Sequence, residues 1–322
     1  MIDEGLVVEQ VSFAYRPETP VLSNVRARVA RGGLVGILGP NGSGKTTLLR
    51  LLAGLLSPLE GRVLVDGVDV QTLRRRDLSR RMAMVPQETQ IAFEYTVLEM
   101  AVMGRYPHLR AFEIEGPDDV EIAREALRAT GTLQLQSRMF NTLSGGEKQR
   151  VVIASALAQL ERRNLADLKV GSTDEPAAPQ AGSTNATATI QTYVAPTVQT
   201  YVEPTFRSAR PLFSEVLLLD EPTASLDLAY QLEIRSTLER LNHTRGLTIV
   251  VSTHDLNLAA GLCRDLILLD RGRVLATGPT ASMLDADLIR QLYGVEVDVA
   301  TNTRTGQLTV VPVSRVEDAR PS

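Results

Sequence analysis

Apolar residues recur along the chain in short runs that end at glycine or at polar residues. Residues 34–38 and 216–219 are nearly all apolar, which is typical of parallel strands buried on both faces. Residues 6–15 and 21–29 instead carry β-branched and aromatic residues in partial alternation, which predicts antiparallel strands. The pattern therefore predicts an α/β protein with an antiparallel part near the N-terminus.

Helical periodicity predicts helices at residues 96–106, 118–130, 228–242 and 281–293. The first two lie between strands, so a helical subdomain of about residues 88–160 is expected inside the α/β part.

The last third of the chain carries two hairpin patterns. Residues 266–270 and 273–276 flank an Arg-Gly turn, and residues 295–299 and 308–313 flank a polar segment. A flexible tail is expected at 314–322.

A stretch at about residues 164–210 differs from the rest in being rich in Thr, Ala, Pro, Gln and Gly. It contains a near-repeat, with Tyr193 and Tyr201 at equivalent places. This composition favours a mobile surface insertion without a core, although tyrosine docking groups or pairing of its two halves are alternatives. Residues 1–313 are otherwise expected to form a single domain.

Composition and charge exclude several kinds of protein. The formal net charge of −4 and pI near 5.6 disfavour binding to nucleic acid. The N-terminus lacks a signal-peptide pattern, and no apolar run reaches the roughly 18 residues that would cross a bilayer. The chain is expected to stay in the cytosol unless a partner anchors it. The single cysteine, Cys263, is expected to be a core residue.

A phosphate-binding loop of the form G-x-x-x-x-G-K-[ST] lies between a strand pattern and a helix pattern. Its glycines allow backbone N–H groups to point inward, and the helix adds the partial positive charge of its N-terminus. Lys45 is expected to reach the outer phosphates and Thr46 to bind Mg²⁺. The loop residues are Gly39, Pro40, Asn41, Gly42, Ser43, Gly44, Lys45, Thr46 and Thr47.

Further polar residues stand where predicted strands end. Asp220 and Glu221 follow one apolar strand, Gln87 follows another, and His254 follows a third. Ion-paired carboxylates and a structural histidine are the ordinary alternatives, but parallel strands deliver such groups to one ligand-binding edge. A second phosphate-binding surface is expected at a helix start formed by Ser144, Gly145 and Gly146.

In this order, these motifs resemble the ATP-binding subunits of ABC transporters. The match covers about residues 2–280, apart from the insertion, and the combination of Leu143-Ser-Gly-Gly-Glu with Leu219-Asp-Glu-Pro is specific. The resemblance implies a P-loop NTPase (RecA-like) core with an antiparallel β subdomain and an inserted helical subdomain. It also implies an ATPase with ATP and Mg²⁺ as cofactors.

The resemblance assigns catalytic roles. Glu221 would be the general base for water, and His254 would contact the γ-phosphate and hold the attacking water and Glu221 in register. Gln87 and Asp220 would complete the Mg²⁺ and water shell with Thr46.

The resemblance also assigns nucleotide and partner contacts. Tyr15 would stack on adenine. Asp227 would lie at the interface of a head-to-tail homodimer, in which Ser144, Gly145 and Gly146 face the ATP of the other subunit. Integral membrane permease subunits and, indirectly, an extracytoplasmic substrate-binding protein would be partners, with the chain peripheral to the cytoplasmic face of the inner membrane.

Within the family, residues 96–109 and 252–257 look like the subfamily that imports iron-siderophore complexes, haem or cobalamin. Residues 156–160 and 224–231 are similar to haem importers, although the insertion is much longer. His108 suggests a haem ligand, but a surface histidine near the permease contact is favoured.

Two alternatives are a soluble ABC-type ATPase of DNA repair or translation, and a regulatory subunit that binds ATP without turnover. A single motif set without heptads or a cysteine pair disfavours the first. The presence of Glu221 and His254 disfavours the second.

Overall fold

The computed structural model describes residues 4–89, 91, 93–162, 214–224 and 226–315. The expected insertion at about 164–210, with its near-repeat, lies outside the described residues, as does most of the expected tail. The single domain over residues 1–313 therefore stays a prediction.

The strands are β1 (Glu4–Arg16), β2 (Thr19–Ala30), β3 (Leu34–Leu38), β4 (Glu60–Val65), β5 (Val68–Asp69), β6 (Met82–Val85), β7 (Val216–Asp220), β8 (Thr248–Thr253), β9 (Asp265–Asp270), β10 (Arg273–Pro279), β11 (Val295–Thr301) and β12 (Leu308–Arg315). The α-helices are α1 (Lys45–Leu52), α2 (Arg75–Ser79), α3 (Val97–Val102), α4 (Pro117–Ala129), α5 (Gly145–Leu160), α6 (Leu228–Arg245), α7 (Leu256–Leu262), α8 (Thr280–Met283) and α9 (Ala286–Tyr293). Short 3₁₀ helices are η1 (Met103–His108), η2 (Leu133–Leu135) and η3 (Phe140–Thr142).

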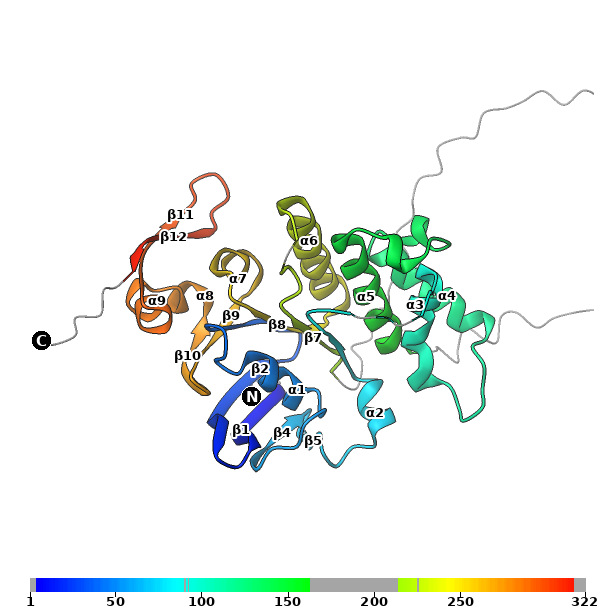
Figure 1. Cartoon of the computed structure of the whole chain (residues 1–322), viewed down its shortest axis with the longest axis horizontal. Coiled ribbons are helices and arrows are strands. Elements are labelled where there is room, and N and C mark those ends of the chain that lie inside the picture. Colours follow the sequence, from blue (N-terminus) through cyan, green and yellow to red (C-terminus); the bar gives the residue numbers. More distant parts are fainter. Residues whose placement is uncertain (1–3, 90, 92, 163–213, 225, 316–322) are drawn as a thin grey trace, which may run out of the picture. The chain divides into compact units, whose positions relative to one another are not determined.

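A six-stranded sheet with the order β10-β9-β3-β8-β7-β6 forms the centre of this part of the chain (Figure 1). Its strands are parallel except for β10, which pairs antiparallel with β9. Every residue of β3, β7 and β8 is buried, as expected for strands covered on both faces. The predicted α/β class is confirmed.

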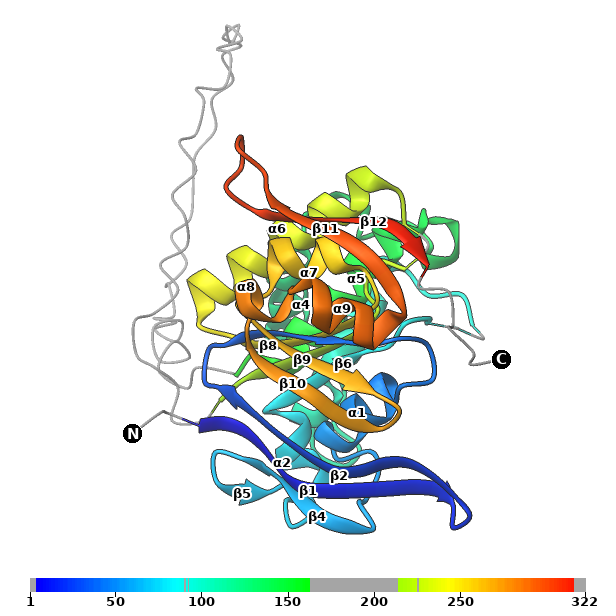
Figure 2. The ribbon, with the colours of Figure 1, turned by 90° about the vertical axis from the view of Figure 1, so that its left-hand side faces the viewer.

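Alternate residues of the central strands enter two different hydrophobic clusters. Leu217 and Leu219 join one cluster, which includes residues of α5, α6 and α7, whereas Val216 and Leu218 join another with α1 and the antiparallel strands. This follows from the two-residue period of a strand. Figure 2 shows α6 and α7 on one side of the sheet and β1, β2 and β4 on the other.

The antiparallel sheet has the order β2-β1-β4-β5. β1 pairs with both β2 and β4, so the two strands expected near the N-terminus are confirmed as neighbours. β2 is followed in the chain by β3, which ends at the phosphate loop.

The helix predicted at residues 96–106 is wrong in its second half. Thr96 caps α3 through a reciprocal capping box with Glu99, but regular helix ends at Val102 and continues as η1. Pro107 cannot donate a backbone hydrogen bond. Gly104 packs so tightly that a Cβ there would lie 2.1 Å from a backbone carbonyl oxygen of α5.

A buried ion pair holds the helical part together. Arg105 Nε lies 3.1 Å from Asp119 Oδ1, and both side chains are fully buried. Arg105 also donates to the carbonyls of Ala158 and Glu161, near the end of α5. The pair therefore joins η1, α4 and α5.

His108, expected from the sequence to be a surface histidine near the permease contact, is partly covered, and the contact itself stays a prediction. Its ring is half-buried, and Nε2 lies 2.7 Å from the carbonyl oxygen of Gln159. Burial lowers the pKa of His108 to about 4. Cys263 is buried as expected, and burial raises the pKa of its thiol to about 12.

The predicted helix at residues 281–293 consists of two helices, α8 and α9. Asp285 interrupts it because its carboxylate caps the first turn of α9. The predicted hairpin of β11 and β12 is confirmed, and β12 extends to Arg315. The side chain of Asn257, on α7, accepts from the backbone N–H of Val310 and donates to its carbonyl, so the hairpin is docked on α7.

Candidate active site

The phosphate loop joins β3 to α1 as the sequence predicts. Gly42 and Gly44 have φ values of +80° and +104°, a region that favours glycine. Gly44 is the N-cap of α1 and supplies no side-chain cap. The first N–H groups of this helix therefore remain available to an anion.

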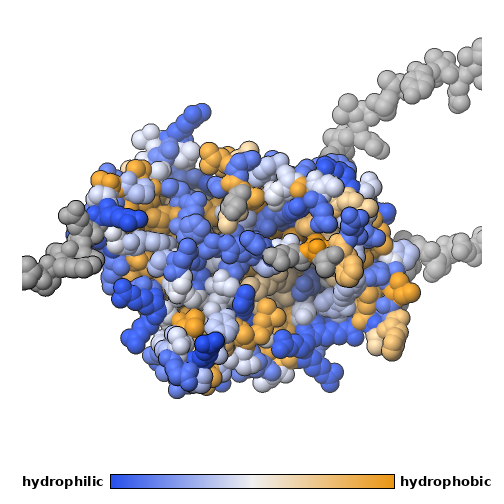
Figure 3. Space-filling model, in the orientation of Figure 1, coloured by the Kyte–Doolittle hydropathy of each residue, from blue (hydrophilic) through white to orange (hydrophobic). Residues whose placement is uncertain are grey.

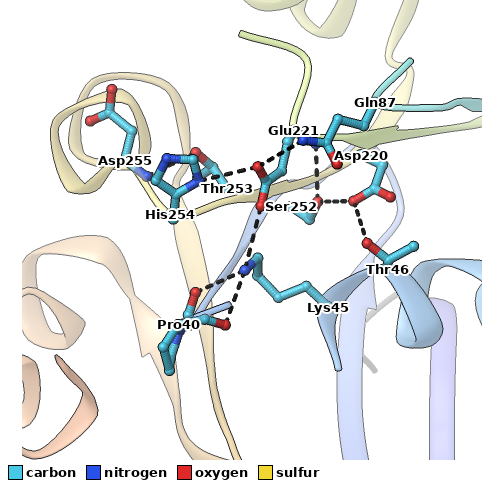
Figure 4. A network of polar contacts seen from close by, with 11 residues as sticks. Pro40, Lys45, Thr46, Gln87, Asp220, Glu221, Ser252, Thr253, His254 and Asp255 are labelled. Atoms are coloured by element: carbon cyan, nitrogen blue, oxygen red, sulfur yellow. Dashed lines mark hydrogen bonds and ion pairs between the residues drawn. The ribbon is translucent and has the colours of Figure 1, made fainter. Parts of the chain in front are cut away.

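Lys45 lies inside the loop and is 6% exposed. Its Nζ donates to the carbonyl oxygens of Gly39 at 2.9 Å and Pro40 at 3.3 Å, and lies 3.5 Å from Glu221 Oε1 (Figure 4). The ammonium group is thus placed between the loop and a strand-end carboxylate.

Asp220 connects the phosphate loop to the neighbouring strand. Its Oδ1 accepts from Thr46 Oγ1 at 3.1 Å and from Ser252 Oγ at 2.6 Å, and the residue is 3% exposed. A hydroxyl and a carboxylate are hard oxygen donors of the kind that Mg²⁺ prefers. The residues that the sequence suggested for Mg²⁺ therefore have fitting chemistry.

Glu221 has a strained backbone, with a φ of +44° immediately after β7. Its N–H lies 3.1 Å from both the carbonyl and the hydroxyl oxygen of Ser252. Its Oε2 lies 3.2 Å from His254 Nδ1 and 3.5 Å from Gln87 Nε2, as Figure 4 shows. Three groups from three segments, Lys45 among them, converge on this one carboxylate.

Ser252 was not among the residues singled out from the sequence, although it fixes both Asp220 and Glu221. It is fully buried and pairs in register with Asp220. The available signal was a pair of hydroxyl residues, Ser252 and Thr253, that follows the apolar run Ile249–Val251 at the end of β8 where the ligand groups gather.

A cleft of about 670 Å³ opens over these residues, a size within the usual range of ligand pockets. Its lining includes Asn41, Gly42, Gly44, Lys45, Thr46, Thr47, Gln87, Glu221 and His254. Tyr15 lies beside the loop, because its hydroxyl is 3.4 Å from Thr47 Oγ1, and its ring is 55% exposed. Tyr15 is not among the described residues that line the cleft, and its stacking on adenine stays a prediction.

The signature residues lie elsewhere. Ser144 caps α5 in a capping box with Glu147, and Asp227 caps α6. Among the described residues that line the cleft, none is Ser144, Gly145, Gly146 or Asp227. The fold brings together the loop, Gln87, Asp220, Glu221 and His254, but not the signature.

The glycine-rich loop lies between β3 and α1, and the acidic residues stand at the end of β7, two strands from β3 in the sheet. Together with the inserted helical part, this arrangement defines a P-loop nucleoside-triphosphatase core. A family model described as "ABC transporter" matches residues 22–167. The chain belongs to the ABC transporter family, among its ATP-binding proteins. The resemblance noted from the motifs and the predicted fold class are both confirmed.

Three comparisons extend this result. The chain is 37% identical over 92% of its length to the cobalamin import ATP-binding protein BtuD of Halobacterium salinarum, and spans 60% of that protein. It is 35% identical over 92% of its length to the hemin import ATP-binding protein HmuV of Bordetella pertussis, and spans 95% of it. Among solved structures, a chain of a metal-chelate type ABC transporter in an inward-facing conformation matches with a TM-score of 0.71 at 25% identity, covering 97% of this chain and 98% of that one.

Proposed function

We propose that the chain is the ATP-hydrolysing subunit of an importer for haem or a related iron chelate, or cobalamin. The observation that carries this proposal is the position of Glu221 among Lys45, Gln87 and His254, next to the Thr46–Asp220 pair. Phosphoryl transfer to water requires charge neutralisation and an aligned nucleophile, and these groups supply both.

Each residue has a role in that reaction. The ammonium of Lys45 and the N–H groups of the loop bind the phosphates. Glu221 accepts the proton of the attacking water, since its carboxylate faces the cleft. His254, whose Nδ1 lies 3.2 Å from Glu221 Oε2, holds Glu221 and the water in register. Tyr15 provides a face for the adenine.

Mg²⁺ would be held by Thr46, Asp220 and Gln87, whose side chains offer oxygen donors. When bound, it supplies positive charge to the outer phosphates. The protein's own contribution is to place Asp220, which Ser252 holds at 2.6 Å.

The proposed working unit is a head-to-tail homodimer. The separation of the signature residues from the cleft supports this proposal, because among the described residues they do not line the cleft of their own chain. Ser144, Gly145 and Gly146 begin α5, whose N-terminus suits an anion, so a second subunit's nucleotide is the proposed ligand. Asp227 would lie at the same interface.

Permease subunits are the proposed membrane partners. Apolar side chains gather on the face shown in Figure 3 over the region of α3 and α4. Phe112 and Ile114, just before α4, are 104% and 82% exposed. No helix in the described residues is long and apolar enough to cross a membrane. We place the chain on the cytoplasmic face of the inner membrane, with the extracytoplasmic binding protein reached only through the permease.

The relatives support import, but they differ in cargo: one is named for cobalamin and one for hemin. The soluble DNA-repair or translation alternative gains no support from them. Haem is preferred to cobalamin because the hemin relative is matched along 95% of its length and the cobalamin relative along 60%.

Growth of the source organism tests the proposal. The gene is deleted and restored in media that supply iron only as haem, iron only as a ferric siderophore, or cobalamin only at a limiting level. We expect the deletion strain to lose growth in one medium. The wild-type chain should restore growth and Glu221→Gln should not, although both the wild-type and the variant chain should be found in the membrane fraction. Normal growth in all three media, with the chain absent from membranes, would contradict it.

A further inference from the structure

A tyrosine of α6 packs against the signature residues. The ring of Tyr230 occupies the space beside Gly146, where a Cβ would lie 2.3 Å from Tyr230 Cγ. A Cβ on Gly145 would lie 3.2 Å from Cδ2 of Leu226. The first turn of α5 is therefore shaped to receive residues that flank Asp227.

Polar contacts reinforce this packing at both ends of Tyr230. Its hydroxyl lies 3.3 Å from Ser144 Oγ, which donates to it. Its backbone N–H donates to Asp227 Oδ1 at 3.1 Å. One residue thus contacts two of the groups that the proposed function places at the dimer interface.

Charged neighbours fix the orientation of the ring. The guanidinium of Arg150, on α5, lies over Tyr230 at 5.8 Å from the ring centroid. Arg150 Nη1 lies 2.6 Å from Glu233 Oε2, one turn further along α6. The ring therefore lies between α5 and α6, in contact with both the start of α5 and Arg150.

We propose that Tyr230 is a positioning residue for the signature, which sets the Ser144 hydroxyl toward the phosphates of the nucleotide held by the partner subunit. The inference rests on the proposed function. Ser144 Oγ already accepts from Glu147 N–H at 3.3 Å. When a phosphate binds, the hydrogen bond between Tyr230 and Ser144 reverses, and the Tyr230 hydroxyl donates to the second lone pair of Ser144 Oγ. The Ser144 hydroxyl then donates a hydrogen bond to the phosphate.

The test uses the full chain carrying Glu221→Gln, with Mg²⁺ and ATP, and measures ATP-dependent dimerisation by sedimentation. Tyr230→Phe keeps the ring and removes the hydroxyl. We expect the dimer to weaken about ten- to hundredfold, because a head-to-tail dimer contains two copies of this hydrogen bond and each is worth about three- to tenfold. Nucleotide affinity under monomeric conditions should not change. The matched control is Ser236→Ala, which removes an exposed hydroxyl of α6 that donates to the carbonyl of Leu232 in the same helix.

A double-mutant cycle separates positioning from general packing. If Tyr230 acts through Ser144, Tyr230→Phe has no further effect once Ser144→Ala is present. Additive effects, or an unchanged dimer in Tyr230→Phe, would overturn the inference alone. If the Glu221→Gln chain does not dimerise with ATP at all, the homodimer of the proposed function fails as well.

Discussion

Lys45 Nζ lies 3.5 Å from Glu221 Oε1, so the cation expected to bind phosphate faces the carboxylate expected to activate water. Both side chains are shielded, at 6% and 13% exposure. In the proposed mechanism the phosphates of ATP become the partners of Lys45. The Glu221 carboxylate can then accept a proton from the attacking water, while His254 stays next to it.

His254→Ala removes the group 3.2 Å from Glu221 Oε2. Loss of alignment at a reacting group costs on the order of 10²-fold, so we expect kcat to fall by about that factor, with a smaller change in KM. Phosphate release under steady-state conditions measures it. His243→Ala, at an exposed position on α6, is the control. An unchanged kcat in His254→Ala would remove this histidine from the mechanism.

Asp119→Ala tests the buried pair that joins η1, α4 and α5. Arg105 would keep a buried guanidinium without its carboxylate, and we expect a loss of about 3–5 kcal/mol in the free energy of unfolding. Urea unfolding measures this loss. Asp118→Ala, which removes an exposed carboxylate from the same first turn, should change stability by less than about 0.5 kcal/mol. Similar values for the two variants would contradict the assignment.

The half-buried ring of His108 predicts a pH dependence of stability. Burial lowers its pKa to about 4, whereas the pKa of an unfolded histidine is about 6.5. Between these values unfolding takes up a proton, so stability falls as pH falls from about 6.5 to about 4 and is unaffected by this residue above that window.

Comparison of urea unfolding for wild-type and His108→Gln across this pH range checks the expectation. The variant lacks the titrating ring, so its free energy of unfolding should decline less steeply on acidification. Parallel curves for the two chains would show that His108 titrates alike in the folded and unfolded states.

Local sequence rules predicted most of the elements. A strand buried on two faces, such as β7, is a nearly continuous apolar run, and the spacing of Gly39 and Gly44 before Lys45 identifies the phosphate loop. These rules failed where a tertiary contact or a capping residue determines the end of a helix. Gly104 lies inside the helix predicted over residues 96–106, but its contact with α5 is visible only in three dimensions. Asp285 lies inside the helix predicted over residues 281–293, but its side chain caps the start of α9.

The site shows the same division. The strand-end position of Asp220, Glu221 and His254 predicted that they would meet, since parallel strands share an edge. The role of Ser252 could not follow from spacing, because it depends on the register of β7 against β8. The packing of Tyr230 on Gly146 joins residues far apart in the sequence, which no local pattern encodes.

The central claim is that Glu221 is the general base on a phosphate site built by Lys45, Thr46 and Asp220. The most direct measurement is single-turnover hydrolysis of ATP by the full-length Glu221→Gln chain, alongside its ATP affinity. We expect affinity to be retained and hydrolysis to slow by about 10² to 10⁴-fold, the scale of a lost general base. Hydrolysis at the wild-type rate in this variant would contradict the account.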